Sequence, residues 1–271
     1  MKNKFAVILG VVVLLSSCQR GFTADATNEL KTLVMQVRTD IQAGKRTEAE
    51  LGDDLKQFDF LLAEHKGEKT DAVAQILYMK AMLYGEVLHD KAKADELEKQ
   101  LKADFGSTEF VANLEKREAA GAAAKKINDA LAVGTQFPDF NEKDVTGQPL
   151  SIANYKGKVV MIDFWATWCG PCVGELPNVI ATYQKHHAQG FEIIGVSLDS
   201  ERAKLVAFTA DKNMTWQQFF DGQGWANKLA VKYGIESIPA TFLLDGNGKI
   251  IGRDLRGEEL EDAVAKAVSG K

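Results

Sequence analysis

The spacing of apolar residues changes near Val133, and this change constrains the fold more than any other feature of the sequence. Before it, apolar residues recur three or four positions apart, which predicts amphipathic helices. After it, short apolar runs alternate with helix-length amphipathic segments, which predicts a sheet covered by helices on both faces. The sequence therefore predicts an all-α domain followed by an α/β domain.

The predicted helical domain comprises residues 25–118 and contains four or five amphipathic helices. Short breaks at residues 43–45 and 65–67 separate them, so neighbouring helices are expected to run antiparallel. Residues 76–107 faintly resemble one tetratricopeptide-type helix pair, but true arrays repeat and this segment does not. A small helical bundle that binds a partner or self-associates is the simpler interpretation.

Residues 119–132 (AAGAAAKKINDALA) are rich in good helix formers and poor in large apolar residues. We expect them to form an exposed helix that links the two domains.

The predicted α/β domain comprises residues 133–271. Its expected strands are residues 158–165, 191–198, 241–244 and 249–253, and its expected helices are residues 171–187, 201–213, 225–233 and 258–269. The sequence DGNG at 245–248 predicts a hairpin turn between the last two strands, because Asn and Gly accept positive φ. The order predicts a central mixed sheet flanked by helices.

The first 18 residues contain basic, apolar and small-residue segments in that order. Lys2 and Lys4 precede an apolar run at residues 5–15, which is too short to span a bilayer and suits a signal peptide. Cys18 follows two serines, as in bacterial lipoprotein signals, so we expect residues 1–17 to be removed, Cys18 to carry lipid and residues 18–24 to form a tether. This predicts a protein anchored in the cell envelope, facing the periplasm or extracytoplasmic space. A soluble periplasmic protein with an ordinary cleavage site is the alternative.

Composition excludes nucleic acid as an expected partner. The chain has 271 residues and is 45% apolar, enough to bury a core. Its 33 Lys and Arg are outnumbered by 38 Asp and Glu, which gives a net charge of -5 and no basic surplus for phosphates.

The chain has three cysteines, and their positions limit the reactions that it is expected to carry out. If Cys18 carries lipid, Cys169 and Cys172 remain as one C-x-x-C pair. A disulfide between them would close a very short loop and constrain little, so redox work explains the pair better than stability does. A zinc site needs four ligands, and no histidine stands at finger spacing from the pair, so we expect no metal and no cofactor beyond the disulfide.

Local geometry predicts different roles for the two sulfurs. Cys169 lies where a strand gives way to a helix, and Pro171 suits a first helical turn. The positive end of the helix dipole favours a thiolate there, so Cys169 is the expected attacking sulfur. Cys172 is expected on the same side but deeper, where it would resolve a mixed disulfide. Gly170 is small and is expected to keep the approach open.

Several segments together resemble one known family. They are residues 163–172 (DFWATWCGPC), 134–140 (GTQFPDF), 156–158 (KGK) and 234–242 (GIESIPATF), with Glu175 and Pro177. They resemble the TlpA/ResA-like branch of the thioredoxin superfamily over residues 132–271. The resemblance implies a thioredoxin-like fold and a thiol-disulfide oxidoreductase. It also implies substrates among exported protein disulfides, apocytochrome c included, and recharging by a membrane thiol-transfer donor.

Asp163 and Glu175 are the expected acids near the pair. Asp163 lies in an apolar strand, where burial should raise its pKa, and it matches the buried Asp of thioredoxin. It is a candidate proton relay for Cys172, and the alternative is a carboxylate that bonds a neighbour. Glu175 matches a family glutamate and is the second candidate proton relay, and its alternative is a solvated helix residue.

The segment around Ile238 and Pro239 matches the cis-proline of the superfamily. A cis bond would turn the Ile238 backbone outward, where a substrate strand can pair with it. Trp168 is expected to flank this groove or to be a surface aromatic, while Trp216 and Trp225 are interpreted as structural.

The pattern leaves other functions open. The Gly170–Pro171 dipeptide and Asp163 favour a reductant, with an oxidant or isomerase as the alternative. A thiol peroxidase is disfavoured because Ala166 and Ile162 replace the Thr or Ser and the Pro that peroxiredoxins carry. A binding or scaffold protein would not explain why both sulfurs and the Ile-Pro are present.

Overall fold

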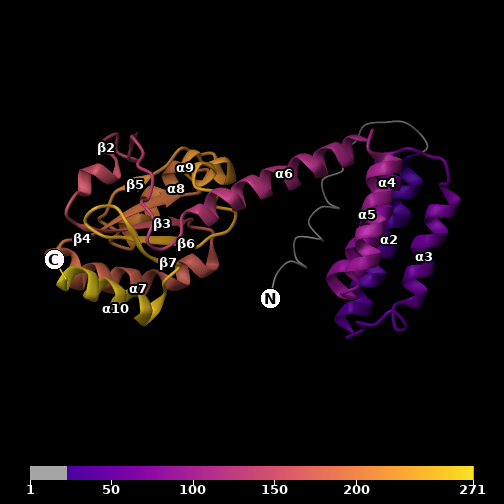
Figure 1. Ribbon diagram of the computed structural model, residues 1–271, viewed down its shortest axis with the longest axis horizontal. Coiled ribbons are helices and arrows are strands. Elements are labelled where there is room, and N and C mark those ends of the chain that lie inside the picture. The colour runs from indigo at the N-terminus through magenta and orange to yellow at the C-terminus, as the bar shows by residue number, and fades with distance from the viewer. Residues whose placement is uncertain (1–22, 271) are drawn as a thin grey trace. The chain divides into compact units, whose positions relative to one another are not determined.

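The computed structural model describes residues 23–270, and the chain divides into two compact units, Met1–Glu118 and Ala119–Lys271 (Figure 1). The predicted signal peptide and Cys18 lie outside the described residues.

The first unit is helical. Its elements are α2 (Thr23–Gln42), α3 (Gly52–Glu64), α4 (Asp71–Met82), the π-helical turn η2 (Leu83–Val87), α5 (Lys91–Phe105) and the first half of α6 (Glu109–Ala130). Side-chain caps fix three of the helix starts. Thr70 accepts from the Val73 amide, Asp90 from the Lys93 amide, and Thr108 from the Val111 amide.

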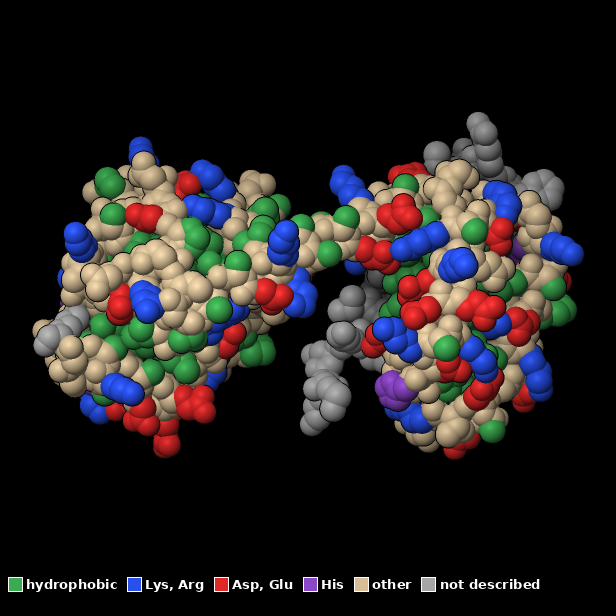
Figure 2. Space-filling view, in the orientation of Figure 1, with side chains coloured by type: hydrophobic (Ala, Val, Ile, Leu, Met, Phe, Trp, Pro, Cys, Tyr) green, Lys and Arg blue, Asp and Glu red, His purple; other side chains and the backbone are tan. Residues whose placement is uncertain are grey.

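The apolar stripes of these helices face inward and form the core of the unit. Leu30, Leu51, Phe58 and Ile76 are among its most buried side chains. On the face shown in Figure 2, acidic and basic side chains are interspersed over this unit. Lys93 and Glu48 form an ion pair in the same unit, with 2.8 Å between Nζ and Oε1. That face presents no surface of a single charge sign.

Helix α6 runs without a break through the segment expected to be a separate linker. Its second half is bonded to the α/β unit: Asn128 Nδ2 donates to the Tyr233 carbonyl at 3.3 Å, and Arg253 Nη1 donates to the carbonyls of Asn128 and Leu131, both at 3.0 Å. Gly234, with a positive φ of 64°, lies against the Ala124 carbonyl, where a Cβ would clash. Residues from Ala124 onward are thus part of the second unit and are held by contacts within it.

The second unit contains a five-stranded mixed sheet with strand order β5-β4-β3-β6-β7. The strands are β3 (Val159–Trp165), β4 (Phe191–Ser197), β5 (Gln218–Phe219), β6 (Ala240–Leu244) and β7 (Ile250–Arg253). Strands β3, β4 and β5 are parallel, whereas β6 and β7 run antiparallel to their neighbours. This confirms the predicted central mixed sheet with a closing hairpin. Strand β5 and the small ladder of β1 (Glu142–Lys143) with β2 (Pro149–Leu150) were not predicted.

The helices of this unit are η3 (Ile152–Tyr155), α7 (Gly170–His186), η4 (His187–Gln189), α8 (Arg202–Asp211), η5 (Gly224–Ala226), α9 (Lys228–Lys232) and α10 (Gly257–Ser269). Helices α7 and α10 lie side by side on one face of the sheet, and α9 lies on the other (Figure 1). Strand β3 is buried along its whole length, and it leads directly to α7. The residues between the end of β3 and the start of α7 are therefore fixed by the core on one side and lie at the carboxyl edge of the strand on the other.

Candidate active site

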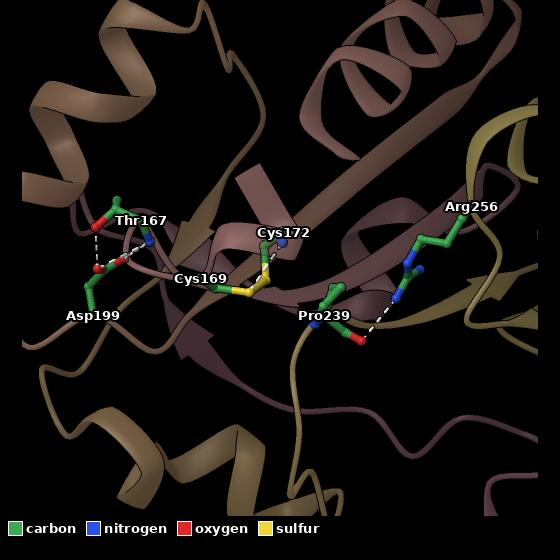
Figure 3. Close-up of a disulfide and its surroundings, with 6 residues drawn as sticks. All are labelled: Thr167, Cys169, Cys172, Asp199, Pro239 and Arg256. Atoms are coloured by element: carbon green, nitrogen blue, oxygen red, sulfur yellow. Dashed lines mark hydrogen bonds between the residues drawn. A yellow bond between two sulfur atoms is a disulfide. The ribbon is translucent and has the colours of Figure 1, made fainter. Parts of the chain in front are cut away.

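A disulfide joins Cys169 and Cys172 where β3 leads into α7 (Figure 3). Cys169 is the N-cap of α7, and its sulfur accepts a hydrogen bond from the Cys172 amide at 3.2 Å. Pro171 occupies the first turn, where its missing amide proton costs no hydrogen bond. When the disulfide is reduced, the hydrogen bond from the Cys172 amide and the helix dipole favour a thiolate at Cys169.

The two cysteines are almost equally buried, at 5% exposed for Cys169 and 4% for Cys172. The expected greater depth of Cys172 is therefore not seen in the disulfide form. A Cβ added at Gly170 would meet no atom within 4 Å, so the space there does not depend on glycine.

Asp163 lies buried in β3, with 5% of its surface exposed. In the part of the chain that the structure describes, its carboxyl accepts no hydrogen bond. Burial raises the pKa of Asp163 from 3.8 to about 7, while the charge of Arg256 lowers it and that of Glu175 raises it further. An acid that titrates near neutrality thus lies in the strand that leads to the disulfide.

Glu175 is half-buried on α7 and has two partners. One carboxylate oxygen accepts from the Gly257 amide at 2.7 Å, at the start of α10, and the other accepts from Asn178 Nδ2 at 3.1 Å. The alternative of a freely solvated helix residue does not fit these contacts. Glu175 therefore links α7 to the start of α10.

The Ile238–Pro239 peptide bond is cis, as the sequence predicted, and Pro239 lies beside the disulfide (Figure 3). Within residues 23–270, the amide and the carbonyl of Ile238 have no hydrogen-bond partner. The Pro239 carbonyl instead accepts from Arg256 Nη2 at 2.9 Å. The segment just before the proline therefore offers free backbone groups next to the sulfurs.

A buried polar network fixes the turn before Cys169. Asp199, only 2% exposed, accepts from the Thr167 hydroxyl at 2.6 Å, from the Thr167 amide at 3.1 Å and from the Ser197 hydroxyl at 2.8 Å (Figure 3). Sequence reasoning missed Asp199 and Arg256, because an acid after a strand and a base before a helix are usually solvated.

Two tryptophans lie at the surface next to this turn. Trp168 is 54% exposed and Trp225 is 50% exposed, and their ring centroids are 6.2 Å apart. The interpretation of Trp225 as structural is wrong, because the short turn η5 carries it out of the core. Trp216 is buried, as expected. Asn227, fully buried, anchors the Trp225 turn by donating to the Ser197 carbonyl at 3.1 Å.

No group of three or more His, Cys, Asp or Glu side chains between residues 23 and 270 is arranged to hold a metal ion. Cys169 and Cys172 are bonded to each other, so the chemistry described by the geometry is that of a dithiol and its disulfide.

Comparison with known proteins supports this chemistry. The model of the AhpC/TSA family matches residues 133–253. The chain is 35% identical over 121 residues to the thiol-disulfide oxidoreductase ResA of Geobacillus thermodenitrificans, an alignment that covers 45% of this chain and 68% of that protein. The chain belongs to the ResA family of thiol-disulfide oxidoreductases. It is also 30% identical over 135 residues to ResA of Bacillus anthracis, covering 49% of this chain and 75% of the relative.

The match to ResA confirms the resemblance inferred from the motifs, and it makes the protein an enzyme that acts on the thiols and disulfides of other proteins. Among solved structures, the thioredoxin domain of a thiol-disulfide oxidoreductase from Bacteroides vulgatus is 31% identical, with a TM-score of 0.47; the alignment covers 51% of this chain and 98% of that one.

Proposed function

We propose that this protein is an envelope-anchored reductant of disulfides in exported proteins, and that Cys169 and Cys172 are its redox pair. The observation that carries the proposal is the disulfide itself, placed at a helix N-terminus beside a cis-proline and near a buried acid. The helix N-terminus would stabilise a thiolate, the segment before the cis-proline would pair with the substrate, and the acid would transfer a proton. All three would act on the same pair of sulfurs.

The reaction begins with the reduced pair. The Cys169 thiolate attacks one sulfur of a substrate disulfide, forms a mixed disulfide and releases the other substrate sulfur as a thiolate. Cys172 then loses its proton and attacks the Cys169 sulfur, which restores the Cys169–Cys172 disulfide and releases the second substrate thiolate. Two electrons pass from the protein to the substrate, and the substrate thiolates take up protons according to their own pKa values.

Asp163 is the proposed acceptor of the Cys172 proton, directly or through water. Its pKa of about 7 means that at neutral pH it is present in both protonation states, so it accepts and releases a proton readily. A carboxyl with an ordinary pKa would be ionised throughout and would be a weaker base.

The substrate is proposed to bind as an extended strand. The free amide and carbonyl of Ile238 support this mode, because an exposed backbone pair can add one strand-like segment beside the sulfurs. Trp168, which precedes Cys169 in the sequence, and Trp225, whose ring lies against that of Trp168, offer exposed apolar surface for the substrate. A protein segment with an accessible disulfide fits this arrangement.

The reductive direction is supported by the Gly170–Pro171 dipeptide and by Asp163, both of which are thioredoxin-like. An oxidant or isomerase would use the same sulfurs with a higher reduction potential, which is therefore the property that separates them. In the reductive role, a membrane thiol-transfer donor would recharge the pair, and apocytochrome c is one candidate substrate.

Anchoring is proposed to occur through lipid on Cys18, after export directed by residues 1–17. The basic start, short apolar run and Ser-Ser-Cys sequence support this part of the proposal. Between residues 23 and 270, no helix has the length and apolar character needed to cross a bilayer.

Trapping of substrates tests the two-cysteine scheme. A Cys172→Ser variant lacks the resolving sulfur, so it should accumulate mixed disulfides with its substrates through Cys169. A matched Cys169→Ser variant should trap none and should be inactive. If Cys172→Ser captured no protein while the parent reduced its substrates normally, the scheme would be wrong.

A further inference from the structure

Arg256 lies in the turn before α10, and its guanidinium points toward the cis-proline segment (Figure 3). Nη2 donates to the Pro239 carbonyl at 2.9 Å, and Nη1 donates to the Thr241 hydroxyl at 2.8 Å and to the Leu255 carbonyl at 2.7 Å. One side chain thus fastens the segment that leads from the cis-proline into β6 to the start of α10.

The same guanidinium lies on the side of the sheet that carries Asp163. Thr241 and Asp163 are register partners on the antiparallel strands β6 and β3, so their side chains project from the same face, with Cβ atoms roughly 5 Å apart. Because Arg256 binds the Thr241 hydroxyl, its positive charge is placed over that face and acts on the Asp163 carboxyl.

Two charged groups face Asp163 from the elements packed around it. Arg256 acts from the turn before α10, and Glu175 acts from α7. The Gly257 amide, next to Arg256, holds the Glu175 carboxylate at 2.7 Å. Within the described residues, Arg256 is the cation that acts on Asp163, and Glu175 is the anion.

We propose that Arg256 is a positioning residue of the dithiol site, which holds the cis-proline segment in place beside the sulfurs and controls the ionisation of Asp163 through its charge. The inference rests on the proposed function, because only there does Asp163 have a part in the dithiol chemistry.

The charge has a defined direction of effect. Burial favours the neutral form of Asp163 and raises its pKa, whereas the nearby guanidinium favours the ionised form and limits that rise. Without Arg256, the pKa of Asp163 would lie above its present value of about 7, and less of the base would be available at neutral pH. Arg256 therefore keeps part of Asp163 ionised at neutral pH, and the ionised form can accept a proton.

Arg253 provides a matched control. Arg253 stands three residues before Arg256 and is also half-buried. It also donates to backbone carbonyls, but these belong to Asn128, near the end of α6, and to Leu131, just after it. A change at Arg253 removes an arginine and its carbonyl contacts without removing the charge that faces Asp163.

The electrostatic part is tested in the oxidised full-length protein, labelled with ¹³C at the aspartate carboxyls. The Asp163 signal is assigned by its loss in Asp163→Asn, and its midpoint is followed against pH. Arg256→Gln should raise the midpoint by about one pH unit. Arg253→Gln should leave it unchanged, and Arg256→Lys, which keeps the charge, should restore the parent value.

An unchanged midpoint in Arg256→Gln, or an equal shift in Arg253→Gln, would overturn the electrostatic part. Should Arg256→Gln not fold, a midpoint raised by a full unit in Arg256→Lys would contradict it instead. This titration is made without substrate and in the disulfide form. It therefore tests the effect of Arg256 on the pKa of Asp163 even if Cys172→Ser traps no substrate and the proposed function is wrong.

The holding of the cis-proline segment is tested by kinetics. Neither Arg256→Gln nor Arg256→Lys keeps the two guanidinium nitrogens that donate to the Pro239 carbonyl and to the Thr241 hydroxyl. For an extended peptide disulfide, KM should rise about fivefold, equivalent to roughly one hydrogen bond of 1 kcal/mol, while KM for a small disulfide should not change. Equal KM values for the peptide in the parent and both variants would overturn this part.

Discussion

Replacing Asp163 by asparagine is expected to stabilise the α/β unit at neutral and alkaline pH. The carboxyl is buried and its pKa is raised from 3.8 to about 7, so the folded protein resists ionisation that the unfolded chain permits. Asparagine has nearly the same shape and no charge to bury. The variant therefore avoids the free-energy cost of a buried carboxyl that cannot ionise as readily as it does in the unfolded chain.

The magnitude follows from the shift. A rise of about 3 units corresponds to about 4 kcal/mol, at 1.36 kcal/mol per unit. Below the unfolded pKa of 3.8, Asp163 is neutral in both states and costs nothing. Between 3.8 and about 7 only the unfolded state ionises, so the stability of the parent falls as pH rises. Above about pH 7 both states are ionised, and the full penalty remains.

Urea denaturation of the oxidised full-length protein measures this effect. All four tryptophans lie in the α/β unit, so their fluorescence reports on that unit alone. Asp163→Asn should be more stable than the parent by about 4 kcal/mol at pH 8, and by less than about 1 kcal/mol at pH 4. Asp262→Asn, at an exposed position on α10, should change stability by less than about 0.5 kcal/mol at both pH values. A gain of the same size at pH 4 and pH 8 would refute the reasoning.

Three other predictions concern Trp225, Asp199 and Cys18. Trp225→Ala should raise KM for protein disulfides severalfold, as measured by steady-state kinetics, and should leave the reduction potential unchanged, as measured by redox equilibration. Val231→Ala removes another exposed side chain and should change neither KM nor the reduction potential. Asp199→Ala should destabilise the α/β unit by about 2 to 4 kcal/mol, because it leaves the buried Ser197 hydroxyl and the half-buried amide and hydroxyl of Thr167 without their acceptor. An effect below about 1 kcal/mol on denaturation would speak against a structural network. Cys18→Ala should abolish incorporation of labelled fatty acid in cells and Cys169→Ala should not, and undiminished labelling of Cys18→Ala would rule out the proposed anchor.

The sheet could be predicted from the sequence because its long strands are continuous apolar runs. The expected strands at residues 158–165 and 191–198 differ from β3 and β4 by one residue each. Strand β5 has only two residues, too few for any periodicity to appear. The continuity of α6 was missed because its alanine-rich second half carries no apolar stripe, and tertiary contacts at Asn128 and Gly234 fix it instead.

The sulfurs, the cis-proline and the buried acid could be predicted because each belongs to a local motif. Arg256 and Asp199 could not, because their roles depend on partners that are distant in sequence. Arg256 binds a carbonyl 17 residues away, and Asp199 binds the backbone 32 residues away. Trp225 was misread for a related reason, since the exposure of an aromatic residue in a three-residue turn depends on where that turn is anchored.

The reduction potential of the Cys169/Cys172 couple tests the central claim most directly. The full-length protein would be equilibrated in defined dithiol-disulfide buffers, and the fraction of reduced pair measured at each potential. A reductant is predicted to have a value near that of thioredoxin, about -270 mV. A value near about -120 mV, that of the oxidant DsbA, would contradict the reductive direction, and the lack of any reversible couple would contradict the redox role of the pair.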